Sequence, residues 1–112
     1  MKIALCSNRA QLSDNLAESL AQTPYIIVVD TETAKIKTIC NKRHYCDKYH
    51  CQKHTARKVL ESGAQVLIAG QVSQEILPWF KRKQIFFFNQ NTPISAQEAL
   101  RAYQATALHI TR

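Results

Sequence analysis

The amino-acid sequence predicts a single α/β domain, residues 1–112, in which helices flank a mixed, mostly parallel sheet of about five strands. Short apolar runs rich in β-branched residues alternate with segments of helical periodicity, a pattern typical of sheets covered on both faces. A chain of 112 residues has room for one hydrophobic core. Hydrophobic residues at 46% and charged residues at 21% exclude a disordered chain and a coiled coil.

The first third of the chain predicts strands at 3–7, 25–30 and 35–40 and a helix at 12–21. The helix has leucines at helical spacing behind Ser13, a suitable N-cap, and Pro24 bars its continuation, so we expect a β-α-β start. The strands at 25–30 and 35–40 are expected to form an antiparallel hairpin at the edge of the sheet.

The strand at 35–40 alternates in polarity. Lys35 and Lys37 face one way, which suits an edge strand, whereas Ile36, Thr38 and Cys40 face the other way. We therefore expect Cys40 to continue the buried face of its strand, and Cys6, inside an apolar run, to be buried as well.

The remaining elements are a helix at 47–61, a strand at 66–69, a short helix near 76–80, a strand at 85–88 and a helix from 95 onward. Gly63 follows the first of these helices as a C-terminal glycine would. Pro78 argues against a long regular helix around it, and Ser95 with Glu98 forms a capping box for the last one.

In such sheets, ligands collect beyond the carboxyl ends of the strands. The residues at these ends that we take as candidates for binding a cofactor are Cys6, Gly70, Gln71 and Asn89.

The net charge is confined to one segment. Residues 35–58 hold eight lysines and arginines against Asp47 alone, so this segment carries the whole net charge of +7. The seven basic and seven acidic residues elsewhere cancel. The basicity is therefore a local field that favours an anionic partner.

The same segment concentrates groups that bind soft and borderline metals. Residues 40–54 follow the pattern C-x3-H-x-C-x3-H-C-x2-H, and the six candidate metal ligands are Cys40, His44, Cys46, His50, Cys51 and His54. A helix beginning near Asp47 places His50 and His54 one turn apart. Taken by itself, His44 could also be a solvated loop histidine rather than a metal ligand. His109 lies apart from this segment, and we expect it to be a surface residue.

Neither standard metal site fits this pattern well. Zinc needs four closed ligands, fewer than the six candidates, and an iron–sulfur cluster prefers four cysteines, of which the segment has three. A preassembled anionic cluster, of iron–sulfur or molybdenum–iron–sulfur type, accommodates both the thiols and the surrounding cations. Lys42 and Arg43 are the basic residues we expect to contact it.

Several function classes stay open. The chain contains no phosphate loop, no H-E-x-x-H and no recognisable nucleophile with its base, which favours a non-enzymatic role. The alternative is a zinc-stabilised basic module that binds nucleic acid, with Tyr45 and Tyr49 available for stacking, although the spacing of known zinc fingers is absent. A basic face with a structural zinc is a third interpretation. The absence of an export signal or a transmembrane run predicts a cytoplasmic protein with free thiols.

Four stretches of the chain, residues 1–4, 24–30, 63–70 and 95–103, resemble in order the dinitrogenase iron-molybdenum cofactor biosynthesis family. The last of them has the form AxEALxAY. These small proteins bind or carry nitrogenase cofactor precursors and related metal–sulfur clusters.

The resemblance implies a ribonuclease H-like three-layer α/β sandwich, a carrier function, a donor or acceptor metalloprotein as partner, and a site within 40–54 whose ligation does not transfer residue by residue. The family usually continues with glycines after the position of Gly70, where this chain has Gln71, Val72 and Ser73. Close approach of a ligand to the backbone is therefore less expected at this turn.

Overall fold

The computed structural model describes residues 1–41, 48–90 and 93–110. They form a five-stranded sheet of order β3-β2-β1-β4-β5. The strands are β1 (Lys2–Ser7), β2 (Tyr25–Asp30), β3 (Ile36–Cys40), β4 (Val66–Ala69) and β5 (Phe86–Asn89). The helices are α1 (Lys48–Glu61), α2 (Leu77–Arg82) and α3 (Ala96–Ile110), with a short 3-10 helix η1 (Leu20–Gln22).

The sheet is mixed, and four of its five strands point the same way. β2 is antiparallel to both of its neighbours, β1 and β3, whereas β1 pairs with β4 and β4 with β5 in parallel. The predicted antiparallel edge hairpin is confirmed by the pairing of Tyr25 with Cys40 and of Val29 with Ile36. The carboxyl ends of β3, β1, β4 and β5 consequently lie at one edge of the molecule, called here the carboxyl edge.

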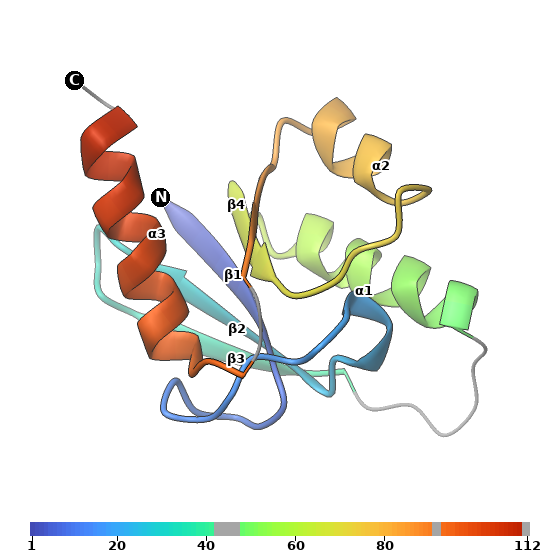
Figure 1. Ribbon diagram of the computed structural model, residues 1–112, viewed down its shortest axis with the longest axis horizontal. Coiled ribbons are helices and arrows are strands. Elements are labelled where there is room, and N and C mark those ends of the chain that lie inside the picture. The colour runs from blue at the N-terminus through green and yellow to red at the C-terminus, as the bar shows by residue number, and fades with distance from the viewer. Residues whose placement is uncertain (42–47, 91–92, 111–112) are drawn as a thin grey trace.

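Helices cover both faces of the sheet, in three layers (Figure 1). Because side chains alternate along a strand, β1 sends Ala4 and Cys6 to one face and Ile3 and Leu5 to the other. The first pair belongs to a core closed by α1 and α2, and the second to a core closed by α3.

The predicted helix at 12–21 and the β-α-β start are wrong. The chain there makes turns and isolated bridges, and η1 is its only helical piece among the described residues. The leucine spacing is misleading because its members serve two cores: Leu16 packs on the α3 side, and Ala17 and Leu20 on the α1 side. Their backbone N–H groups bond to distant carbonyls of Ile94, Cys6 and Gln71 instead of to one another.

The predicted buried face of the 35–40 strand is also wrong. Ile39 packs against the core below α1, whereas Ile36 is 55% exposed and Cys40 is exposed. Such a reversal is possible because β3 is an edge strand, with a neighbouring strand on one side only.

The remaining predicted elements are present. Gly63, with φ of +79°, is the second residue after the end of α1 and has the conformation that favours glycine. α2 is short and has its proline in the first turn, and the Ser95 hydroxyl accepts the N–H of Glu98 at the start of α3. Within the described ranges, no helix is long and apolar enough to cross a membrane.

Candidate metal-cluster site

α1 begins at the carboxyl edge and runs back across the sheet. Shortly after the C-terminus of α1, the Gln65 N–H donates to the Lys2 carbonyl at the start of β1. The first turns of α1 therefore lie at the other end of β1, where this strand ends. One contact confirms this direction: the Gln52 side chain accepts the N–H of Ser73 at 3.0 Å, in the loop after β4. The predicted ligand positions on α1 therefore lie at the edge where four strands end.

Asn41 joins the exit of β3 to this helix. Its side-chain amide donates to the Thr55 hydroxyl at 2.8 Å and to the Thr23 carbonyl at 2.9 Å, and its backbone N–H donates to the Pro24 carbonyl. The residue is 8% exposed. These bonds hold Asn41 against the second turn of α1, at Thr55, the residue that follows His54.

The same side chain has an unused acceptor. Among the described residues, Asn41 Oδ1 is the one buried side-chain oxygen or nitrogen without a hydrogen-bond partner. Leaving a buried acceptor unpaired costs about 1–3 kcal/mol, so such groups in folded proteins generally call for an explanation. The candidate site thus contains a buried polar atom that can accept one more donor.

The structure describes only part of the predicted ligand set. Lys42, Arg43, His44 and Cys46 lie outside the described residues. His50 and Cys51 occupy helical positions in α1, with their backbone alone described, and His54, half-buried, follows His50 by one turn. Among the described side chains, no group of three or more histidines, cysteines and carboxylates comes together.

Cys40 belongs to the other face of β3. Its neighbours Ile39 and Asn41 both face α1, so the alternation of the strand turns Cys40 away from that helix. Thr38, on the same face as Cys40, donates its hydroxyl to the Ala10 carbonyl at 3.1 Å, in the loop after β1. Cys40 therefore lies on one face of β3, and α1 with His54 lies on the other.

An open groove of about 680 Å³ lies on the Cys40 side of the carboxyl edge. It is lined by Asn8, Arg9, Ala10, Gln11, Asp14, Pro24 and Tyr25. Tyr25 is the cross-strand partner of Cys40. The groove is thus lined by polar groups and one guanidinium, and none of the predicted metal ligands is among its lining residues.

Cys6 does not fit the cofactor-binding role predicted for it. Its side chain is fully buried between β2 and the core below α1. Burial raises the pKa of the thiol to about 12, against the weaker opposing effect of a hydrogen bond with Thr23. A neutral thiol without access to the surface is a core residue.

The crevice predicted at Gly70, Gln71 and Asn89 is filled by the chain itself. A Cβ at Gly70 would overlap the Glu18 carbonyl, so this glycine is required by a close approach of the protein's own backbone. Gln71 N–H donates to the same carbonyl at 2.8 Å, and Asn89 Nδ2 donates to the Gly70 carbonyl at 2.7 Å. These residues close the edge between β1, β4 and β5.

Two described lysines of the basic segment meet beside β3. Lys37 from the edge strand and Lys58 from α1 line a second groove, of about 370 Å³, together with Glu61 and Ser62. On the opposite side of α1, the Lys53 ammonium lies 5.8 Å from the centre of the Trp79 ring. The positive charge of residues 35–58 is thus distributed on both sides of α1.

The family model for the dinitrogenase iron-molybdenum cofactor matches residues 1–106. The chain belongs to this family. No curated protein is similar enough to count as a match. This family is named for a nitrogenase cofactor.

Solved structures agree with the fold of this family member. The apo form of the orange protein from Desulfovibrio gigas is 17% identical, with 94% of this chain and 88% of that chain covered and a TM-score of 0.81. The NMR structure of a NifB-type Thermotoga protein of the DUF35 family is 20% identical, covers 93% and 87% of the two chains and has a TM-score of 0.74. At these identities the likeness supports the fold alone.

Proposed function

We propose that this chain binds and carries, without turnover, an anionic metal–sulfur cluster or a nitrogenase-type cofactor precursor as its cargo. Cys46, His50, Cys51 and His54 hold the cargo, with His44 as a further ligand, and Lys42 and Arg43 offset its charge. Cys40, the other candidate for a further ligand, lies on the opposite face of β3 and is not part of this set. A donor or acceptor metalloprotein is the partner in transfer. Family membership supports this class of cargo.

One observation carries the proposal: the start of α1 lies at the carboxyl edge, tied to the exit of β3 by the bond between Asn41 and Thr55. Helical positions 50 and 54 therefore share a stripe at a ligand-binding edge, and position 51 is next to it. Asn41 and Lys48, the described residues that flank Cys46 in the sequence, both lie at this edge.

The charge distribution supports an anionic cargo. Residues 35–58 carry a net charge of +7, and thiolates with metal-bound sulfides are negative. An anionic cluster reduces the repulsion among these cations, while a bare dication adds to it. The cargo therefore needs fewer protein bonds than a conventional zinc or iron–sulfur site.

The test is metal retention after anaerobic reconstitution with iron, sulfide and molybdate. Replacing both Cys46 and Cys51 by serine should lower the metal bound per chain by roughly tenfold or more, because thiolates are the strongest ligands of such cargo. Cys40→Ser is the matched control, and we expect it to retain most of the metal because residue 40 faces the other side of the sheet.

Elemental analysis and absorption spectra separate the outcomes. Equal metal content in the wild type and in the double variant would refute the assignment to residues 40–54. Stoichiometric zinc without iron or molybdenum would support a structural zinc site and contradict the proposed cargo. Loss of metal in Cys40→Ser alone would move the site to the groove beside Arg9 and Tyr25.

A further inference from the structure

The two edge strands of the sheet differ in how they are protected. β3 carries Lys37, and Lys35 precedes it, so a second strand approaching this edge meets two positive charges. β5, at the other edge, consists of three phenylalanines and Asn89 and has no charged side chain. Phe86 is 51% exposed, so an apolar ring rather than a charge stands beside this edge.

The backbone of β5 has hydrogen-bonding groups that point away from the sheet. Phe86 N–H donates to the Gln65 carbonyl and Gln90 N–H to the Ala69 carbonyl, so residues 86, 88 and 90 bond to β4. In a parallel ladder, the residues between them direct their N–H and C=O groups outward. These residues are Phe87 and Asn89, and a β-strand is the ligand that satisfies such a row.

We propose that a second copy of this chain binds here, with β5 pairing antiparallel to β5 of the partner about a twofold axis at Phe88. Phe87 of each copy then lies opposite Asn89 of the other, and both pairs exchange main-chain hydrogen bonds. The same strand serves both sides because a twofold interface is self-complementary. The two sheets become one continuous sheet.

The aromatic residues beside β5 fit this arrangement. Phe88 meets Tyr103 of α3 edge-to-face, with ring centres 5.4 Å apart, and the Phe86 ring lies 6.1 Å from the same tyrosine. At the proposed axis the two Phe88 side chains are direct cross-strand neighbours, and such aromatic pairs stabilise antiparallel strands. The exposed side of Phe86 is covered in the same step.

Charge selects this edge for self-association. β3, which carries Lys37, is at the opposite edge of the strand order, so pairing through β5 keeps the β3 lysines of the two copies apart. Lys81, Arg82 and Lys83 precede β5, and the antiparallel arrangement places these residues of the two copies at opposite ends of the joint. Pairing through β3 would instead bring Lys35 and Lys37 of both copies together.

Sedimentation equilibrium of the intact chain over roughly a hundredfold range of concentration tests the proposal, since a dimer of this kind follows mass action. We expect the mass to rise from 12.8 kDa towards twice that value. Phe86→Lys should raise the dimer dissociation constant by roughly tenfold or more, because it places a charge on the edge. Ile36→Lys, an equally exposed apolar residue on the β3 edge, should leave it unchanged.

A second pair of variants tests strand pairing itself. Phe87→Pro removes an outward N–H without affecting the ladder to β4, and Phe87→Ala removes the same ring while keeping that N–H. Strand pairing requires the proline variant to be monomeric and the alanine variant to dimerise. A wild-type chain that stays monomeric, or equal dissociation constants for Phe86→Lys and Ile36→Lys, would overturn the proposal. Circular dichroism checks the fold, and if Phe87→Pro is unfolded the comparison at residues 86 and 36 decides.

Discussion

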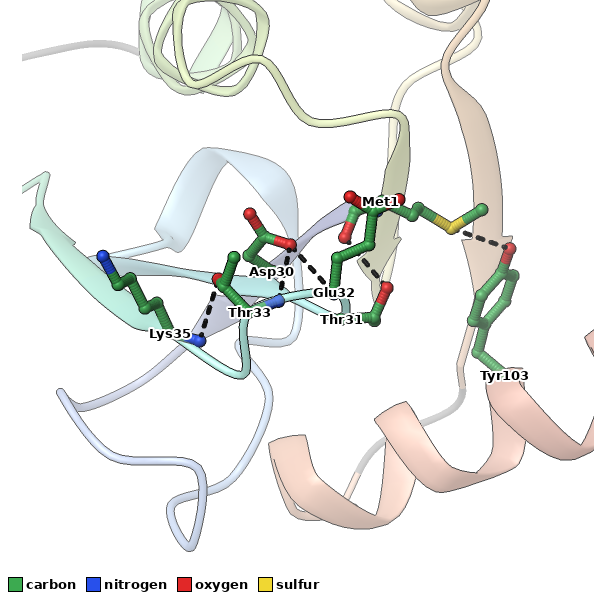
Figure 2. A network of polar contacts seen from close by, with 7 residues as sticks. All are labelled: Met1, Asp30, Thr31, Glu32, Thr33, Lys35 and Tyr103. Carbon is green, nitrogen blue, oxygen red and sulfur yellow. Dashed lines mark hydrogen bonds and ion pairs between the residues drawn. The ribbon is translucent and has the colours of Figure 1, made fainter.

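The two ends of the hairpin formed by β2 and β3 are built in opposite ways. At the turn end, polar groups bond to one another over a few residues (Figure 2): Asp30 accepts the N–H groups of Glu32 and Thr33, and Thr31 donates to the Met1 carbonyl. At the other end, Cys40 is exposed and the buried Asn41 keeps one oxygen unpaired among the described residues. One end is closed by its own hydrogen bonds, and the other retains groups that can bind a ligand.

The reason for the difference is the range of the contacts. The hydrogen bonds at the turn end mostly join residues close together in sequence, apart from the bonds to Met1. The carboxylate and hydroxyl groups that make them are exposed. The carboxyl edge depends on Asn41 reaching Thr23 and Thr55, which are 18 and 14 residues away in sequence. Substitutions at the carboxyl edge should therefore affect stability more than substitutions at the turn, and four predictions test this in order of expected size.

The largest effect is expected for Gly70→Ala. A methyl group there would overlap the Glu18 carbonyl, which is backbone and has little freedom to move. We expect a loss of about 3 kcal/mol in the free energy of unfolding, measured by urea denaturation. Gly63→Ala is the control, because a methyl group there makes only ordinary van der Waals contact with the Lys2 side chain and costs only the strain of positive φ, about 1 kcal/mol. Equal losses in the two variants would contradict the close packing at the edge.

The second effect is expected for Asn41→Ala. Removing the amide leaves the Thr23 carbonyl and the Thr55 hydroxyl without this donor, which should lower the free energy of unfolding by about 2 kcal/mol. At the turn end, Thr33→Ala removes a side chain that accepts the Lys35 N–H at 3.4 Å and should change stability by less than about 0.5 kcal/mol. The contrast between the two ends fails if Thr33→Ala costs as much.

The third effect distinguishes two cysteines of the same edge. The pKa of Cys6 is raised from 9.0 to about 12, so between these values the unfolded chain releases a proton that the folded chain keeps. One pH unit above 9.0, stability should therefore be lower by about 1.4 kcal/mol on account of this thiol, and Cys6→Ala should remove that loss. In native protein, iodoacetamide should label Cys40 and leave Cys6 unmodified, as peptide mass spectrometry would show. Equal labelling would contradict the burial of Cys6.

The smallest effect is expected at Asp30. The Glu32 backbone N–H, followed by that of Thr33, lowers the pKa of this carboxyl below its usual value. Its stabilising contribution is present above the unfolded pKa and is lost as pH falls through the folded pKa. Asp30→Asn should therefore show a slightly smaller fall in melting temperature on acidification than the wild type. Because the carboxylate is fully exposed, we expect a difference near the limit of calorimetric detection.

Local patterns predicted most of the fold. The apolar runs at β1, β2, β4 and β5 are buried strands or sheet edges as expected, and Gly63 and Ser95 mark helix ends by their own chemistry. These signals suffice because strand and helix periodicity and caps depend on neighbouring residues. The segment 12–21 misled because its leucines lie at helical spacing but contact two different cores.

The sequence by itself determined that a single compact segment holds the net charge and six candidate metal ligands, and that α1 brings positions 50 and 54 onto one stripe. The burial of Cys6 also followed from its apolar run. Only the tertiary structure decided that Cys40 faces away from that helix and that residues 17–20 fill the crevice at Gly70. The hydrogen bond between Asn41 and Thr55 could not be predicted from the sequence, because an asparagine and a threonine 14 residues apart form no recognisable pattern. The type of ligand a residue can be follows from the chemistry of its own side chain. Which face of a strand is buried depends instead on the element that packs against it, and this is determined by contacts between residues distant in sequence.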